Sequence, residues 1–97
     1  MSYIRKIIQQ RLNTGVNFYT PADNVVAKLE EYKASGKIES YSLNILSENT
    51  LVKTILITFK DTSSFDEFIG EDVILSSKLA RAQHCENNLI STSLEEA

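Results

Sequence analysis

The chain has 97 residues, 42% of them hydrophobic and 24% charged, which is the length and composition of one small globular domain. Its formal net charge of −3 argues against a dedicated nucleic-acid-binding protein, because such proteins usually carry an excess of Lys and Arg. The single cysteine, Cys85, excludes an intramolecular disulfide and a zinc site built from several cysteines.

The sequence also bears on where the protein is found. It contains no apolar run of about 18 residues, so it predicts no membrane span. The first ten residues, MSYIRKIIQQ, lack the long apolar core of a secretory signal. We therefore expect one domain over residues 1–97 that is intracellular where it is synthesised.

Residues 3–19 fit two structures. Ile4, Ile8 and Leu12 recur at helical spacing, whereas the many β-branched residues and the alternation of Val16 and Phe18 are typical of a strand. We expect a long, irregular first strand, and a short helix followed by a strand is the alternative.

The charges are uneven at the two ends of the chain. Arg5, Lys6 and Arg11 lie in a basic segment, residues 1–20, that contains no acid, while residues 95–97 form a short acidic tail. This basic arm is a candidate contact for a phosphate or an acidic partner, and a solvated face is the simpler interpretation.

The next element is a helix over residues 21–35. Thr20 is placed to cap it, Pro21 suits its first position, and Gly36 can supply the left-handed residue that follows a helix. Inside this range the apolar residues recur at helical spacing, and they are Val25, Val26, Leu29 and Tyr32.

Two alternating segments, residues 38–46 and 51–59, predict a β-hairpin around the turn SENT. The first strand is expected to place Tyr41, Leu43 and Ile45 on one face. The second has Ile55, Ile57 and Phe59 on one face, while Val52 and Leu56 lie on the other. A strand that is apolar on both faces favours an interface, so Val52 and Leu56 are the candidate self-association face.

The segment FKDTSSFDEFIGED, residues 59–72, holds five carboxylates. Ser63 or Ser64 is placed to cap a helix there, with Asp66 and Glu67 expected in its first turn. A calcium loop would need glycine at its sixth position and glutamate at its twelfth, and the loop that would begin at Asp61 has neither. We therefore expect capping and solvated charges here, and no metal site.

Residues 73–86 predict a further helix, followed by a last strand over residues 89–94. The helix is expected to turn Leu75, Leu79 and Ala82 inward. Its expected outward residues are Lys78, Arg81 and Gln83.

Catalytic motifs are missing from the sequence. His84 and Cys85 are neighbours on a helix, so their side chains point to different faces and do not form a nucleophile pair. The three glycines are scattered, and there is no phosphate loop and no dinucleotide fingerprint. We expect no catalytic residue, no metal and no cofactor, and therefore no enzyme.

The order strand, helix, hairpin, helices, strand predicts a ferredoxin-like α+β sandwich, with an antiparallel sheet and helices on one face. The segments LEEYKASGKIESYSLNI and LITFKDTSSFDEFIGED resemble dimeric α+β barrel proteins over residues 25–75. That resemblance implies a sheet face closed by a second subunit, and no catalytic residue is carried over.

The chain also resembles short uncharacterised proteins of tailed bacteriophages, on the segments NTGVNFYTP, FDEFIGEDVI and the hairpin. Together these features predict a non-enzymatic module that binds itself and another protein, as a component of a virion. The alternatives are an accessory factor that binds a host protein and a small dimeric α+β barrel enzyme. No membrane, nucleic acid or small-molecule substrate is expected as a partner.

Overall fold

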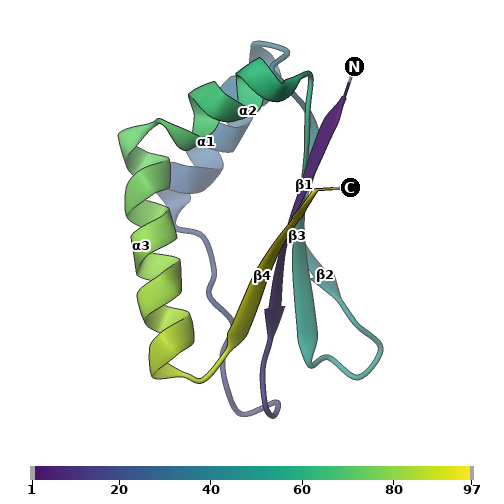
Figure 1. The fold of residues 1–97 in the computed structure, drawn as a ribbon, viewed down its shortest axis with the longest axis vertical. Helices are drawn as coiled ribbons and strands as arrows, with labels where there is room; N and C mark the ends of the chain where they lie inside the picture. The colour runs from purple at the N-terminus through teal and green to yellow at the C-terminus, as the bar shows by residue number, and fades with distance from the viewer. Residues whose placement is uncertain (1, 97) are drawn as a thin grey trace.

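The computed structural model describes residues 2–96, which form a four-stranded antiparallel sheet covered on one face by three helices (Figure 1). The strand order is β2-β3-β1-β4, so the predicted ferredoxin-like α+β fold is confirmed. No helix in this part of the chain is long and apolar enough to cross a bilayer. The elements in chain order are β1 (Tyr3–Gln10), α1 (Asp23–Ala34), β2 (Ile38–Leu46), β3 (Val52–Phe59), α2 (Thr62–Ile69), α3 (Asp72–Asn87) and β4 (Ser91–Glu96).

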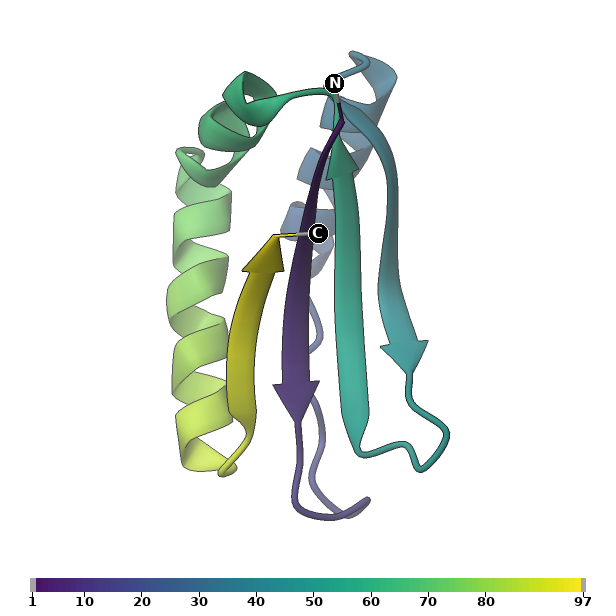
Figure 2. The same cartoon turned by 45° about the vertical axis from the view of Figure 1, so that its right-hand side comes forward.

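Strand β3 lies inside the sheet and alternates as predicted. Ile55, Ile57 and Phe59 are buried against the helices, while Val52 and Leu56 lie half-buried on the opposite, open face. Figure 2 shows the sheet in front of α1, with β2 and β4 at its two edges. The helices therefore cover one face of β3 and leave the other uncovered.

Strand β2 differs from the expected alternation. Tyr41 and Leu43 pack against the core, but the register shifts between Ser42 and Ile45. Ile45 pairs with Thr54, which places it on the open face with 41% of its surface exposed. The prediction that Ile45 shares a face with Tyr41 is wrong, because an irregularity in the ladder changes the two-residue period.

The first strand is shorter than predicted, and the helical alternative for its start is wrong. β1 ends at Gln10, and residues 11–22 form a loop. Arg11 holds this loop, since its guanidinium donates to the carbonyl oxygens of Thr50 at 3.0 Å and Val16 at 2.8 Å. It also lies 4.3 Å from the centre of the Phe18 ring.

Helix α1 starts later than expected. Its N-cap is Ala22, whose side chain makes no capping hydrogen bond, so the predicted start at Thr20–Pro21 is wrong. Gly36 does follow the helix with φ of 81°, and its N–H donates to the Lys33 carbonyl at 3.1 Å, as expected for a glycine-terminated helix.

The cap of α2 is Asp61, and neither Ser63 nor Ser64 is the cap. The Asp61 carboxylate accepts a hydrogen bond from the Ser64 N–H at 2.8 Å, and this bond holds the pKa of Asp61 below its usual value. Because the helix begins one residue after Asp61, Asp66 and Glu67 lie beyond its first turn. The capping interpretation of the segment holds, with a different residue in the role.

The other carboxylates of this segment are dispersed. Glu67 pairs with Lys37 at 2.8 Å, and Glu71 pairs with Lys28 at 2.9 Å. Within residues 2–96, no three side chains of the metal-binding types lie close enough to hold an ion.

The cap predicts a pH-dependent effect of one substitution. Asp61→Ala should lower the melting temperature by a few degrees at neutral pH, because it removes an N-cap acceptor. The folded pKa is depressed, so this stabilisation is complete above about pH 4 and is lost as the pH falls through the folded pKa. Thermal unfolding followed by circular dichroism from pH 7 to pH 2 measures it.

Asp66→Ala, in the same helix but away from the cap, is the matched control and should leave the melting temperature nearly unchanged. Equal effects of the two substitutions at neutral pH would contradict the assignment of Asp61 as the cap.

The open face of the sheet carries an apolar strip. Ile4 and Ile8 of β1 are paired with Thr58 and Thr54, which places them on the same face as Leu56. The strip consists of the exposed Ile45 and four half-buried residues, which are Ile4, Ile8, Val52 and Leu56. Lys6, opposite Leu56, and its other cross-strand partner Glu95 lie on the same face. We expect a second copy of the chain to cover the apolar residues of this face.

This expectation is tested by molar mass. Wild type should run as a dimer or larger species in size exclusion with light scattering, and Leu56→Lys should shift it to the monomer because a charge would be buried in the interface. A wild-type monomer at every concentration would contradict the prediction, and Leu79→Lys on an exposed helix surface is the control.

Candidate functional site

Helix α3 presents a different face to the sheet from the one predicted. Leu79 is 74% exposed, whereas Cys85 is buried and Ile74 packs against the core. Arg81, expected in solvent, is half-buried. The prediction of an inward position is therefore wrong for Leu79 and Ala82, which are exposed, whereas Leu75 lines the space between α3 and the sheet.

The connection between α2 and α3 explains this rotation. Only residues 70–71 separate the two helices, so Val73 and Ile74 must enter the core at the start of α3. The inward face is then set at residue 74 and continues at helical spacing to Ser77, Arg81 and Cys85. The apolar side chain at residue 79 points away from that face.

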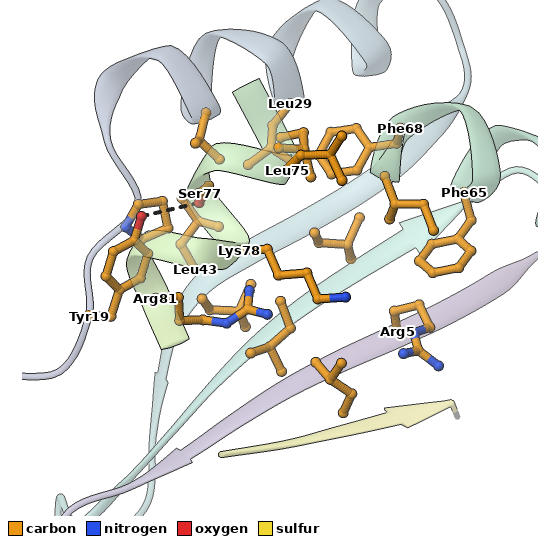
Figure 3. A pocket seen from close by; sticks show the side chains of 18 of the residues that line it. Arg5, Tyr19, Leu29, Leu43, Phe65, Phe68, Leu75, Ser77, Lys78 and Arg81 are labelled. Carbon is orange, nitrogen blue, oxygen red and sulfur yellow. Dashed lines mark hydrogen bonds between the residues drawn. The ribbon is translucent and has the colours of Figure 1, made fainter. Parts of the chain in front are cut away.

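A cavity of about 310 Å³ lies between the sheet and the helices. Its walls are mainly apolar and include Leu29 of α1, Ile55 and Ile57 of β3, and Phe65 and Phe68 of α2 (Figure 3). A cavity of about 150 Å³ in another protein is large enough for benzene. This one is about twice that size, enough for a fused bicyclic ring.

Three cationic side chains line the same cavity. Arg81 and Lys78 extend into it from α3, and Arg5 approaches from β1 on the opposite side (Figure 3). The Arg5 guanidinium carbon lies 5.2 Å from the centre of the Phe65 ring. Among the side chains that the structure describes, no carboxylate forms a salt bridge with any of the three cations.

Arg81 is the most enclosed of these cations. Burial lowers the pKa of its guanidinium, while the nearby thiol of Cys85 and the phenol of Tyr19 act in the opposite direction. Arginine stays charged in proteins even so, and its planar fork of donors suits a carboxylate. The site thus contains a partly desolvated positive charge next to an apolar space.

Two hydroxyl groups meet at one end of the cavity. The phenol oxygen of Tyr19 and the hydroxyl oxygen of Ser77 are 3.1 Å apart and hydrogen-bonded (Figure 3). Two side chains of the sheet fix the backbone of Tyr19, since its N–H donates to Gln9 Oε1 at 3.1 Å and its carbonyl accepts from Lys53 Nζ at 3.2 Å. The position of the phenol therefore depends on a buried polar pair of the sheet.

That polar pair could have been noticed in the sequence. Gln9 and Lys53 are cross-strand partners on the helix-facing side, where the alternation set by Ile7 and Ile55 calls for apolar residues. Burial lowers the pKa of Lys53. The signal is one polar residue in each strand at a position where the alternation calls for an apolar one. It can be interpreted only when the register of the two strands is known.

The predicted basic arm is not one site. Arg5 and Lys6 are adjacent in β1 and point to opposite faces of the sheet, while Arg11 is bound to the loop that follows. Only Arg5 reaches the cavity. Val52 and Leu56, by contrast, do lie together on the open face.

His84 and Cys85 point to different surroundings. His84 Nε2 lies 2.8 Å from the Asn17 carbonyl oxygen, and its ring stands edge-on to Tyr19 with the ring centres 6.0 Å apart. Cys85 is buried at 3% exposure, and burial raises the pKa of its thiol. His84 therefore connects α3 to the loop of residues 11–22, and the thiol of Cys85 is enclosed in the interior.

Neither a protein-family profile nor a curated protein sequence matches the chain. Solved structures do share its fold. A candidate antibiotic biosynthesis monooxygenase from Caulobacter crescentus CB15 superposes with a TM-score of 0.61 at 11% identity, over 98% of this chain and 87% of that one. A conserved protein from Methanosarcina mazei Go1 gives 0.61 at 17% identity, over 98% and 90% of the two chains.

A plant enzyme shares the fold as well. The hydroxynitrile lyase from Passiflora edulis superposes with a TM-score of 0.53 at 14% identity, over 98% of this chain and 93% of the lyase. At these identities the likeness extends to the fold and to no individual residue.

These comparisons overturn the prediction of a non-enzymatic structural component of a virion. The proteins that share the fold over nearly the whole chain include a candidate monooxygenase and a lyase. The layer between sheet and helices also contains a sizeable cavity, which a purely structural module has no need to keep. The sequence argument failed because missing catalytic motifs say nothing about a binding cavity.

The burial of Cys85 gives a direct test of how α3 is seated. Iodoacetamide at mildly alkaline pH should modify the native protein at least about a hundredfold more slowly than the denatured chain, because the thiol is enclosed and its pKa is raised. Mass spectrometry of timed samples measures the rate, with the chain in guanidinium chloride as reference. Modification of the native protein at the denatured rate would contradict this seating of the helix.

Proposed function

We propose that the protein binds a small, largely apolar organic molecule in the cavity between its sheet and its helices. The observation that carries the proposal is the cavity itself, about 310 Å³ with mainly apolar walls and a few polar groups at one side. Ligand sites in proteins usually have this composition, whereas ordinary cores are packed with few voids larger than a water molecule.

The rim of the cavity supports the same function. Ile69, Leu75 and Leu94 line the cavity and remain between 41% and 48% exposed. Exposed leucines and isoleucines gathered at the mouth of an apolar cavity extend the surface that a ligand can bury. A molecule with about a dozen non-hydrogen atoms should bind with a dissociation constant of about 10 µM to 1 mM.

The neighbouring structures support a small-molecule site in this fold and leave the reaction open. A monooxygenase and a hydroxynitrile lyase are different chemistries on one architecture. We therefore limit the proposal to binding and assign no side chain a catalytic role. This binding replaces the expectation that the protein has no small-molecule partner.

One pair of tryptophan variants tests the proposal with naphthalenemethanol as the probe. Leu75→Trp should weaken binding at least about tenfold, because the indole would occupy the rim and part of the cavity. Leu79→Trp is the matched control, since Leu79 lies one turn along the same helix, is 74% exposed and does not line the cavity.

Ligand-observed NMR titrations measure both affinities, and circular dichroism confirms that the variants fold. Failure of the probe to bind wild type at millimolar concentration would count against a naphthalene-sized site. Binding that is unchanged in Leu75→Trp would place the ligand elsewhere.

A further inference from the structure

Three lysines outside the cavity, Lys28, Lys37 and Lys60, have a carboxylate partner. Lys28 bridges Glu31 at 3.0 Å and Glu71 at 2.9 Å, and Lys37 pairs with Glu67 at 2.8 Å. The chain has 13 acidic residues against 10 lysines and arginines, so carboxylates are in excess.

None of the described carboxylates pairs with the cavity cations in spite of this excess. Arg81 and Lys78 line the cavity from α3, and Arg5 lines it from β1 on the opposite side (Figure 3). Arg5 has Glu96 as its cross-strand partner, which leaves the two α3 cations as the basis for an anion site. Lys78 and Arg81 have no acidic partner among the described side chains, and together they create a local attraction for an anion.

The spacing of the two α3 cations suits one ligand group. Residues 78 and 81 are three apart on the helix, so their side chains lie on neighbouring positions of one surface. Figure 3 shows both extending over the apolar floor of the cavity. A charged ligand group that contacts both Lys78 and Arg81 can therefore belong to a molecule whose apolar body lies in the cavity below them.

The burial of Arg81 strengthens the argument. A charge that is partly removed from water is unfavourable unless an opposite charge or hydrogen bonds compensate it. Tyr19 supplies a nearby phenol, but the described residues supply no carboxylate at this position. A carboxylate from a ligand would fill that role with two parallel hydrogen bonds.

We propose that the natural ligand of this cavity is an organic carboxylate, whose apolar body fills the cavity and whose charged group is bound by Arg81 and Lys78. This inference rests on the proposed function, because it concerns the chemical class of the same ligand. The volume favours a body of one or two rings, or an alkyl chain of similar size.

The test compares two probes of nearly equal shape, naphthoate and naphthalenemethanol, by titration calorimetry on the full chain at neutral pH. Wild type should bind naphthoate at least about tenfold more tightly than the alcohol, since a charge-assisted hydrogen bond is stronger than a neutral one. Arg81→Met keeps an apolar stem and should remove this preference, so that the variant binds naphthoate and the alcohol with similar affinity.

Two further variants sharpen the result. Lys78→Gln, at an exposed position, should weaken naphthoate binding several-fold more than it weakens binding of the alcohol. Lys60→Gln makes the same charge change at a lysine that does not line the cavity, and it should change neither affinity. Should Arg81→Met fail to fold by circular dichroism, Lys78→Gln decides the question alone.

The outcomes separate the two proposals. Equal affinity of wild type for both probes, or naphthoate binding that survives both Arg81→Met and Lys78→Gln, would overturn the carboxylate inference and leave the apolar site standing. If neither probe binds, the proposed function fails and this inference fails with it. If inorganic phosphate binds wild type as tightly as naphthoate does, the site binds simple anions, and the apolar part of the inference is wrong.

Discussion

Tyr3 pairs with Phe59 and Gln10 with Val52, so β1 and β3 lie side by side along their full length in one antiparallel register. This pairing decides which side chains face the helices. At one end the shared face carries Tyr3 and Phe59, whose rings pack with Phe65. At the other end the same face carries a buried Gln and Lys. A shift of one residue would invert every one of these positions, so the cavity exists only in this register.

The side chains along that face change from aromatic to polar, and this change explains how the cavity is bounded. The aromatic end is filled by the rings of Phe59, Phe65 and Phe68. The centre of the Phe59 ring lies 5.4 Å from that of Phe65 and 5.5 Å from that of Phe68. The polar end is closed by Tyr19, whose backbone is bound by Gln9 and Lys53. Between these two ends α3 supplies Ser77, which is too short to fill the space, and Arg81, whose guanidinium is too polar to pack there as an apolar side chain would. The unfilled volume is thus a consequence of which residues three separate elements bring to one layer.

Much of the fold could be predicted because the signals are local. The alternation of residues 52–59 and the glycine at position 36 each depend on a few neighbouring residues, and the element order followed from them. The site could not be predicted in the same way. The inward face of α3 is set by the short link after α2, and the face of Ile45 by an irregularity in a strand pairing. Both depend on tertiary contacts, and the periodicity that placed Leu79 and Ala82 inside the protein pointed to an exposed surface.

The cavity and the thin core both limit the apolar surface that this small chain can bury on folding. A chain of 97 residues buries a modest share of its surface, and an unfilled space of this size further reduces the apolar contacts that it makes. A molecule that binds the folded chain alone would restore them, adding about 2.7 kcal/mol of stability at a ligand concentration one hundred times the dissociation constant. The apolar strip around Leu56 on the far side of the sheet is a second place where apolar surface lacks a cover. The two faces of β3 are therefore coupled: whatever covers the strip also stabilises the sheet register on which the cavity depends.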